Sequence, residues 1–167
     1  AEATKVTIYD GDDPSLPMWR VEDYTGLTLR AVIAINGQIW IGASTGVIAS
    51  DYAGGDLGST TLDYTTSTTP AIVNNSVNDF AAIVLPDAPI DPATGLLRVT
   101  IAVATNGGVS VIADNGSVYD SSETAGMAFV AFNESNRLFY NDDASDQVYY
   151  ADTYAADGFS DGHYDTD

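Results

Sequence analysis

The chain has 167 residues, 45% of them apolar, which is enough to form a buried core in one domain or in two small ones. Its 24 acidic residues outnumber five Lys and Arg, and the net charge of −19 disfavours binding to nucleic acid or to anionic membranes. The absence of cysteine excludes disulfides and Cys-ligated metal centres, and the absence of a long apolar stretch predicts no membrane insertion.

Three short apolar runs recur about every 50 residues, at 31–35, 80–84 and 128–132. Each run is unbroken by charge and rich in β-branched or aromatic residues. This pattern predicts a β-strand that is buried on both faces.

The first repeat unit spans about 29–52. Asn36-Gly37 follows its apolar run and predicts a tight hairpin, because both residues tolerate positive φ. A second turn is predicted at 44–46, so three antiparallel strands fit in this unit.

The second unit, about 78–120, is interrupted at 86–95, where three prolines predict a stiff excursion rather than a strand. Glycine and asparagine predict turns at 106–108 and 115–116. In the third unit, about 126–150, turn-forming Asn, Asp and Ser residues again separate short strands.

Few segments have helical spacing, so the predicted class is all-β. Antiparallel hairpin repeats of this length predict propeller-like blades, with a β-sandwich as the alternative. We expect one β-repeat domain at 1–154 and an irregular acidic tail at 155–167. Three blades do not close a ring, so three explanations stay open: the flanking segments add a fourth blade, the chain is a fragment, or copies of it assemble.

Several segments resemble the propeller-like repeats in tail-fibre and other appendage proteins of marine bacteriophages. They are IYDG at 8–11, PSLPMW at 14–19, AINGQIWIG at 34–42, STG at 44–46, IVNNSVND at 72–79, LPDAPIDPATG at 85–95 and IAVATNGGVSVI at 101–112. The resemblance covers roughly 6–150. It implies a structural part of a virion, outside the cell, and it brings no catalytic residues.

Calcium is the candidate metal, because hard cations prefer closely spaced carboxylate and carbonyl oxygens. The best candidate ligands are Asp142, Asp143 and Asp146, since a rigid hairpin would hold them in place. Further acidic clusters lie at 10–13 and 157–167, and none has EF-hand spacing. High-salt adaptation or simple solubility would also explain the acidity.

Three asparagines begin an Asn-x-Ser sequon and would be glycosylation sites in a host with that machinery: Asn74, Asn115 and Asn133. The single histidine, His163, lies in the predicted tail, and the sequence singles out no pair of carboxylates. We therefore predict no catalytic residue and a protein that is not an enzyme.

The expected function is a structural or assembly module of a virion appendage or extracellular fibre, which contacts a host surface. Its expected partners are copies of itself in a homo-oligomer, or other virion or fibre proteins. The alternative is a glycan-binding module that uses calcium, and a glycoside hydrolase fragment ranks third. The aromatic residues considered for sugar stacking are Trp19, Trp40, Tyr140, Tyr149, Tyr150 and Tyr154.

Overall fold

The computed structural model describes residues 4–9, 12–15, 18–51, 63–92, 95–142, 144–145 and 147–164. These ranges contain thirteen strands in four antiparallel sheets and no helix, which confirms the predicted all-β class. In the described part of the chain, no helix is long and apolar enough to cross a membrane.

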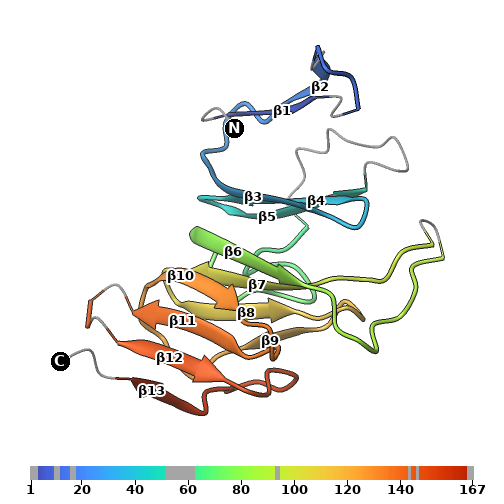
Figure 1. Cartoon of the computed structure of the whole chain (residues 1–167). Coiled ribbons are helices and arrows are strands. Elements are labelled where there is room, and N and C mark those ends of the chain that lie inside the picture. Colours follow the sequence, from blue (N-terminus) through green and yellow to red (C-terminus); the bar gives the residue numbers. More distant parts are fainter. Residues whose placement is uncertain are drawn as a thin grey trace.

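Each sheet is built from strands that follow one another in the sequence (Figure 1). The first sheet contains β1 (Lys5–Tyr9) and β2 (Met18–Asp23). The second contains β3 (Leu29–Ile35), β4 (Gln38–Ala43) and β5 (Gly46–Asp51). The third contains β6 (Val77–Ile83), β7 (Thr100–Thr105), β8 (Gly108–Ile112) and β9 (Val118–Asp120). The fourth contains β10 (Met127–Phe132), β11 (Leu138–Asp142), β12 (Val148–Ala151) and β13 (Gly162–Tyr164).

The sheets stack in chain order, with the first and last at opposite ends (Figure 1). The strand β6 packs against both β3 and β10, so the leading strands of three successive sheets lie side by side. Between the third and fourth sheets, Asn78 donates from Nδ2 to the carbonyl of Met127 at 2.9 Å. The Val130 N–H donates to the Asp79 carboxylate at 3.2 Å. This arrangement fits blade-like repeats.

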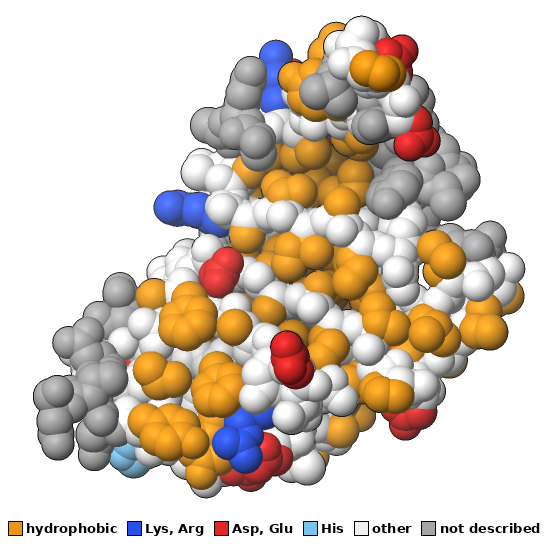
Figure 2. All heavy atoms as spheres, in the orientation of Figure 1, with side chains coloured by type: hydrophobic (Ala, Val, Ile, Leu, Met, Phe, Trp, Pro, Cys, Tyr) orange, Lys and Arg blue, Asp and Glu red, His pale blue; other side chains and the backbone are white. Residues whose placement is uncertain are grey.

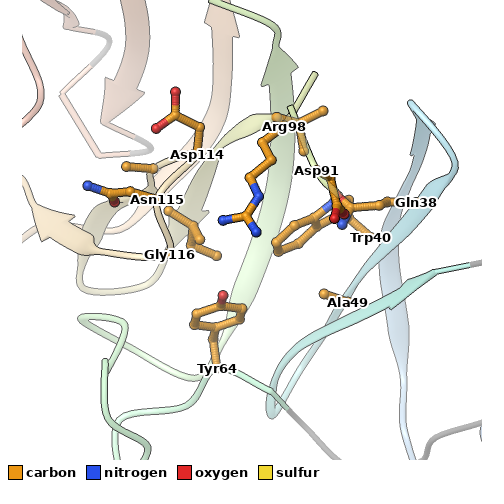
Figure 3. A pocket seen from close by; sticks show the side chains of 12 residues that line it. Gln38, Trp40, Ala49, Tyr64, Asp91, Arg98, Asp114, Asn115 and Gly116 are labelled. Carbon is orange, nitrogen blue, oxygen red and sulfur yellow. The ribbon is translucent and has the colours of Figure 1, made fainter. Parts of the chain in front are cut away.

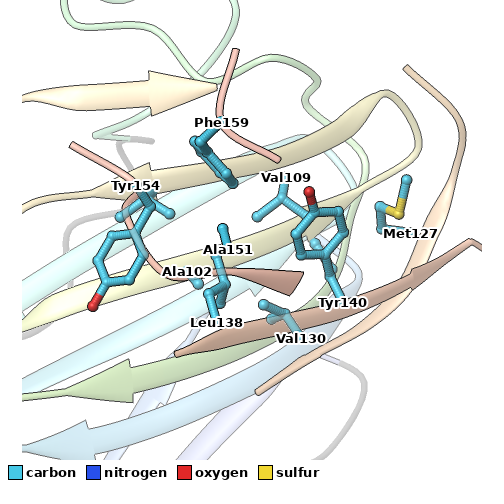
Figure 4. Close-up of a cluster of buried hydrophobic side chains, with 11 residues drawn as sticks. Ala102, Val109, Met127, Val130, Leu138, Tyr140, Ala151, Tyr154 and Phe159 are labelled. Carbon is cyan, nitrogen blue, oxygen red and sulfur yellow. The ribbon is translucent and has the colours of Figure 1, made fainter. Parts of the chain in front are cut away.

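The third sheet is covered on both faces. In β7, Ile101 and Val103 belong to the apolar cluster shared with the second sheet. Ala102 and Ala104 alternate with them and belong to the cluster shared with the fourth sheet (Figure 4). Since successive side chains of a strand point to opposite faces, a strand between two sheets needs apolar residues on both of its faces.

The prediction that the first strand of each unit is buried on both faces is wrong for the first and third units. In the second unit, β6 packs on both faces: Phe80 and Ala82 lie in or against the cluster shared with the second sheet, and Ala81 lies against the cluster shared with the fourth. Side chains in β3 alternate between half-buried and exposed, and Val32 is 36% exposed. In β10, Phe129 is 38% exposed. These strands belong to sheets with a large neighbour on one face only: the two-stranded first sheet is small, and no described strand covers the outer face of the fourth.

The predicted turns are present. Asn36 and Gly37 connect β3 to β4 with φ of 46° and 77°, as the tight hairpin requires. Residues 106–107 connect β7 to β8. The proline-rich excursion also forms, and its described residues contribute no strand beyond one isolated bridge between Ile90 and Leu97.

The predicted irregular tail contains one strand, at the end of its described part, after bends and turns at 155–158. Gly162–Tyr164 forms β13, which pairs with β12. Phe159 is 6% exposed and lies in the core cluster with Tyr140 (Figure 4). One apolar side chain anchors this acidic segment, and the free edge of β12 supplies its backbone hydrogen bonds.

Candidate functional site

The outer face of the fourth sheet is the first candidate surface. In β11, the side chains of Leu138 and Tyr140 point to the core, so the alternating residues point outward. Residues directly opposite one another on paired strands point to the same face of a sheet. The strand register therefore identifies the outward-pointing residues of β10, β12 and β13. The resulting terminal face contains the polar Asn141, Gly162 and six apolar or aromatic residues: Phe129, Ala131, Phe139, Val148, Tyr150 and Tyr164.

The terminal face is accessible in the described structure. Tyr164 is 51% exposed and Phe129 is 38% exposed, while the remaining members are half-buried. Figure 2 shows hydrophobic side chains gathered over this part of the molecule. A contiguous exposed apolar patch of this kind commonly marks an interaction surface.

Arg137 lies beside the terminal face and is held in place. Its guanidinium pairs with Asp152, with Nε–Oδ1 at 2.5 Å and Nη2–Oδ2 at 3.1 Å, and lies 4.7 Å from the centre of the Tyr150 ring. The hydrogen bonds that Arg137 donates to Asp152 raise the pKa of Arg137. The Tyr150 ring also contacts Tyr164, with centroids 5.2 Å apart. The side chains at this edge of the face are therefore ordered and, as an ion pair, electrically neutral.

The second candidate surface is a pocket between the second and third sheets, which we call the inter-sheet pocket (Figure 3). Its volume is about 230 Å³. It is lined by residues from β4, β5, the excursion before β7, and the β8–β9 turn. They are Gln38, Trp40, Ala49, Tyr64, Asp91, Arg98, Val99, Ile112, Ala113, Asp114, Asn115 and Gly116.

Two aromatic rings form one wall of the inter-sheet pocket. Trp40 and Tyr64 are stacked, with centroids 6.0 Å apart and an interplanar angle of 24°. The indole Nε1 of Trp40 donates to Gln38 at 3.3 Å. Backbone hydrogen bonds between Tyr64 and Val47 place the tyrosine beside β5. Burial, and secondarily the Asp63 carboxylate, raises the pKa of Tyr64, so its hydroxyl stays protonated at neutral pH.

Arg98 supplies the positive charge of the inter-sheet pocket. Figure 3 shows its guanidinium pointing into the space between Trp40 and Asn115, toward Tyr64. The two ion pairs seen among the described residues join Arg20 to Glu22 and Arg137 to Asp152, and neither includes Arg98. Positively charged side chains are rare in this protein, which has five Lys and Arg and a net charge of −19, and one of them faces this pocket.

The predicted calcium ligands are described only in part. Asp142 is buried, and its carboxylate accepts hydrogen bonds from the Ala144 N–H and the Ser145 hydroxyl, both at 2.8 Å. These bonds, the Ala144 one foremost, lower the pKa of Asp142. Asp143 and Asp146 lie outside the described residues. Asp142 thus has a turn-forming role, and the calcium site stays a prediction.

The three sequon asparagines share one local structure. The side-chain oxygens of Asn74, Asn115 and Asn133 each accept a hydrogen bond from the backbone N–H of the serine two residues later, at 2.8, 2.9 and 3.0 Å. These are Asx-turns, for which asparagine is favoured on conformational grounds. Asn115 and Asn133 are exposed and Asn74 is half-buried, and glycosylation stays a prediction for all three.

The aromatic residues considered for sugar stacking do not form one surface. Trp40 lines the inter-sheet pocket but is only 5% exposed and belongs to the core cluster between the second and third sheets. Tyr140 and Tyr154 are buried in the core cluster of the fourth sheet. Tyr149 stacks on Tyr140, and Tyr150 lies on the opposite face, as strand alternation predicts. The side chain of Trp19 lies outside the described part.

Sequence reasoning missed two members of the inter-sheet pocket, Tyr64 and Arg98. The available signals were an aromatic residue in a threonine-rich segment and a rare cation after the proline-rich excursion. His163 lies on β13, exposed, with its ring centroid 5.8 Å from that of Tyr149.

Comparison with known proteins gives no functional assignment. No protein-family model and no curated protein matches the chain. A solved structure described as a protein of unknown function from Bacteroides caccae is similar over 98% of this chain, with a TM-score of 0.49 and 12% sequence identity. The chain spans about half of that protein, since the match covers 55% of it.

Proposed function

We propose that the chain is a structural module that assembles by packing a second copy against its terminal face. The observation that carries this proposal is the apolar and aromatic outer surface of the fourth sheet. No described strand covers that surface, although equivalent surfaces inside the stack are buried. Covering Phe129 and Tyr164 would remove their exposed apolar area from water, which is the main driving force for association.

The geometry of the terminal face suits another β-sheet. Antiparallel sheets pack face to face at about 10 Å, with side chains of the two faces interdigitating. A pair of copies that both use this face would be related by a twofold axis, the commonest symmetry of homo-oligomers. The Arg137–Asp152 ion pair at the edge adds no net charge to such a contact.

The overall charge opposes this association. Two copies that each carry a net charge of −19 repel one another, and salt screens that repulsion. Assembly should therefore strengthen as ionic strength rises. The resemblance to marine-phage fibre repeats leads us to extend the proposal to a virion appendage or extracellular fibre, and that extension rests on the resemblance alone.

The test measures mass by sedimentation equilibrium between about 0.05 and 0.5 M salt, a range over which the screening length shortens from above to below 10 Å. We expect dimers that become more stable as salt increases. Phe129→Ser and Tyr164→Ser should shift the protein toward monomer. Ile90→Ser is the control, because Ile90 is 64% exposed but lies on the excursion, away from the terminal face.

A monomer under all of these conditions would contradict the proposal. So would an oligomer that survives both terminal-face substitutions but dissociates with Ile90→Ser.

A further inference from the structure

We propose that the inter-sheet pocket binds a single acidic sugar unit, with Arg98 holding the sugar carboxylate. This inference is independent of assembly, because the pocket lies between the second and third sheets, and the terminal face belongs to the fourth.

We infer a ligand carboxylate from the guanidinium of Arg98, which is the one cation in a described lining that also contains Asp91 and Asp114. A guanidinium presents a planar set of donors that matches a carboxylate in a two-point, charge-assisted interaction. The side chain reaches into the pocket (Figure 3), and it takes part in neither of the ion pairs of the described residues. Arg98 is exposed, so its guanidinium is accessible to a ligand carboxylate.

The remaining lining determines the rest of the ligand. Tyr64 is half-buried and stacks on Trp40, which is 5% exposed, so the tyrosine ring provides most of the accessible aromatic surface against which the apolar face of a sugar ring can pack. Gln38 and the Asp91 carboxylate lie beside these rings and can accept hydrogen bonds from sugar hydroxyls. A small inorganic anion would use Arg98 but leave the aromatic and acceptor groups without a role.

The size of the pocket limits the ligand to one sugar unit. Its volume of about 230 Å³ lies below the common range for ligand sites, which is about 300–1,000 Å³. A monosaccharide, or the end of a longer glycan whose other units lie in solvent, fits this space better than an extended oligosaccharide.

The backbone around Arg98 is fixed at three points. The Arg98 N–H donates to the Pro89 carbonyl at 2.8 Å, and the Asp91 N–H donates to the Leu96 carbonyl at 2.8 Å. Asn36, in the β3–β4 turn, donates from Nδ2 to the Leu97 carbonyl at 2.8 Å. The second sheet therefore positions the excursion that carries Arg98, and Asn36 acts as a positioning residue.

The experiment titrates the whole chain with three probes, followed by two-dimensional NMR and by tryptophan fluorescence. Sodium glucuronate carries the carboxylate and the sugar ring, glucose carries only the ring, and acetate carries only the carboxylate. We expect glucuronate to bind at least about tenfold more tightly than either other probe, because it alone uses both parts of the site.

Two arginine variants form a matched pair. Arg98→Ala should reduce glucuronate binding to the level of glucose, and Arg30→Ala should leave it unchanged. Arg30 is exposed on β3 and is not part of the pocket lining, so it controls for the loss of one positive charge. Equal unfolding midpoints for the two variants would show that both are folded.

Three results would overturn the inference. If acetate binds as tightly as glucuronate, the pocket is a simple anion site. If glucose binds as tightly as glucuronate, the carboxylate does not contribute to binding. Failure of all three probes to bind would exclude an acidic-sugar site.

Discussion

The third and fourth sheets have the same number of strands but different neighbours, and the difference explains their sequences. In the third sheet, β7 and β8 are buried at every position because sheets pack on both sides. In the fourth sheet, large core residues such as Leu138 and Tyr140 line one face only. Its other face is still rich in aromatic residues, as an inner face would be. Apolar content therefore shows that a face is suited to burial, without showing which chain covers it.

The largest expected effect tests the doubly covered sheet. Ile101 in β7 is fully buried between the second and third sheets, so Ile101→Ala should lower the free energy of unfolding by about 2–5 kcal/mol. Val148→Ala, on the terminal face, should cost about 1 kcal/mol or less in the monomer. Urea denaturation at low protein concentration measures both. Equal losses would show that the two sheets are covered to the same extent.

A smaller effect tests how closely the second and third sheets approach. A Cβ on Gly42 would lie 2.6 Å from Cγ1 of Val77 and 3.1 Å from the Phe80 ring, so Gly42→Ala should cost about 1–3 kcal/mol. In the control Gly126→Ala, the nearest atom lies 3.9 Å from the new Cβ. That control should be neutral or gain up to about 1 kcal/mol from the stiffer unfolded chain. A Gly42→Ala protein as stable as the control would mean that the two sheets can separate readily.

The smallest effect concerns the covered face of the fourth sheet at high pH. Burial raises the pKa of Tyr140 to about 12, whereas in the unfolded chain this group ionises near its ordinary value of about 10. Between these values the unfolded state has lost a proton that the folded state retains. Stability should therefore fall as pH rises above about 10, by up to about 1.4 kcal/mol per pH unit from this group.

Tyr140→Phe should remove this contribution. The free-energy difference between wild type and variant should be constant from neutral pH to about 10 and should then move in favour of the variant. Thermal unfolding of both proteins from neutral pH to about 12 measures this free-energy difference. A difference that stays constant above pH 10 would mean that Tyr140 ionises equally in both states.

Local features of the fold were predictable from the sequence. Asn36-Gly37 specifies its turn through its own backbone preferences, and strand alternation separates Tyr149 from Tyr150. The burial of 31–35 was not predictable in the same way, because it depends on the size of the neighbouring sheet. Nor was β13, since the polar segment that contains it is anchored by the single residue Phe159.

The candidate sites depended still more on distant parts of the chain. Tyr64 reaches Trp40 because its segment pairs with β5, and Arg98 joins the same pocket because the second and third sheets stack. The spacing of these residues in the sequence predicts neither contact. The terminal face required the register of four strands before its members could be assigned to one side. Asp142 was identified from the sequence as a candidate ligand, and the structure shows the turn hydrogen bonds that its carboxylate accepts.

The separation of the backbone ladders into four sheets has a mechanical consequence. Strand pairing runs within each sheet. Neighbouring sheets adhere mainly through side chains, with links such as Asn78 to Met127 and Asp79 to Val130. The backbone also joins the third and fourth units, where the Gly158 N–H donates to the Asp120 carbonyl at 2.7 Å. Each sheet is thus a natural cooperative unit that can open with its own free energy, as in other repeat architectures. A force that pulls the two ends of the stack apart would act on these contacts between sheets before it acted on the backbone hydrogen bonds within a sheet. The molecule would then unfold one sheet at a time.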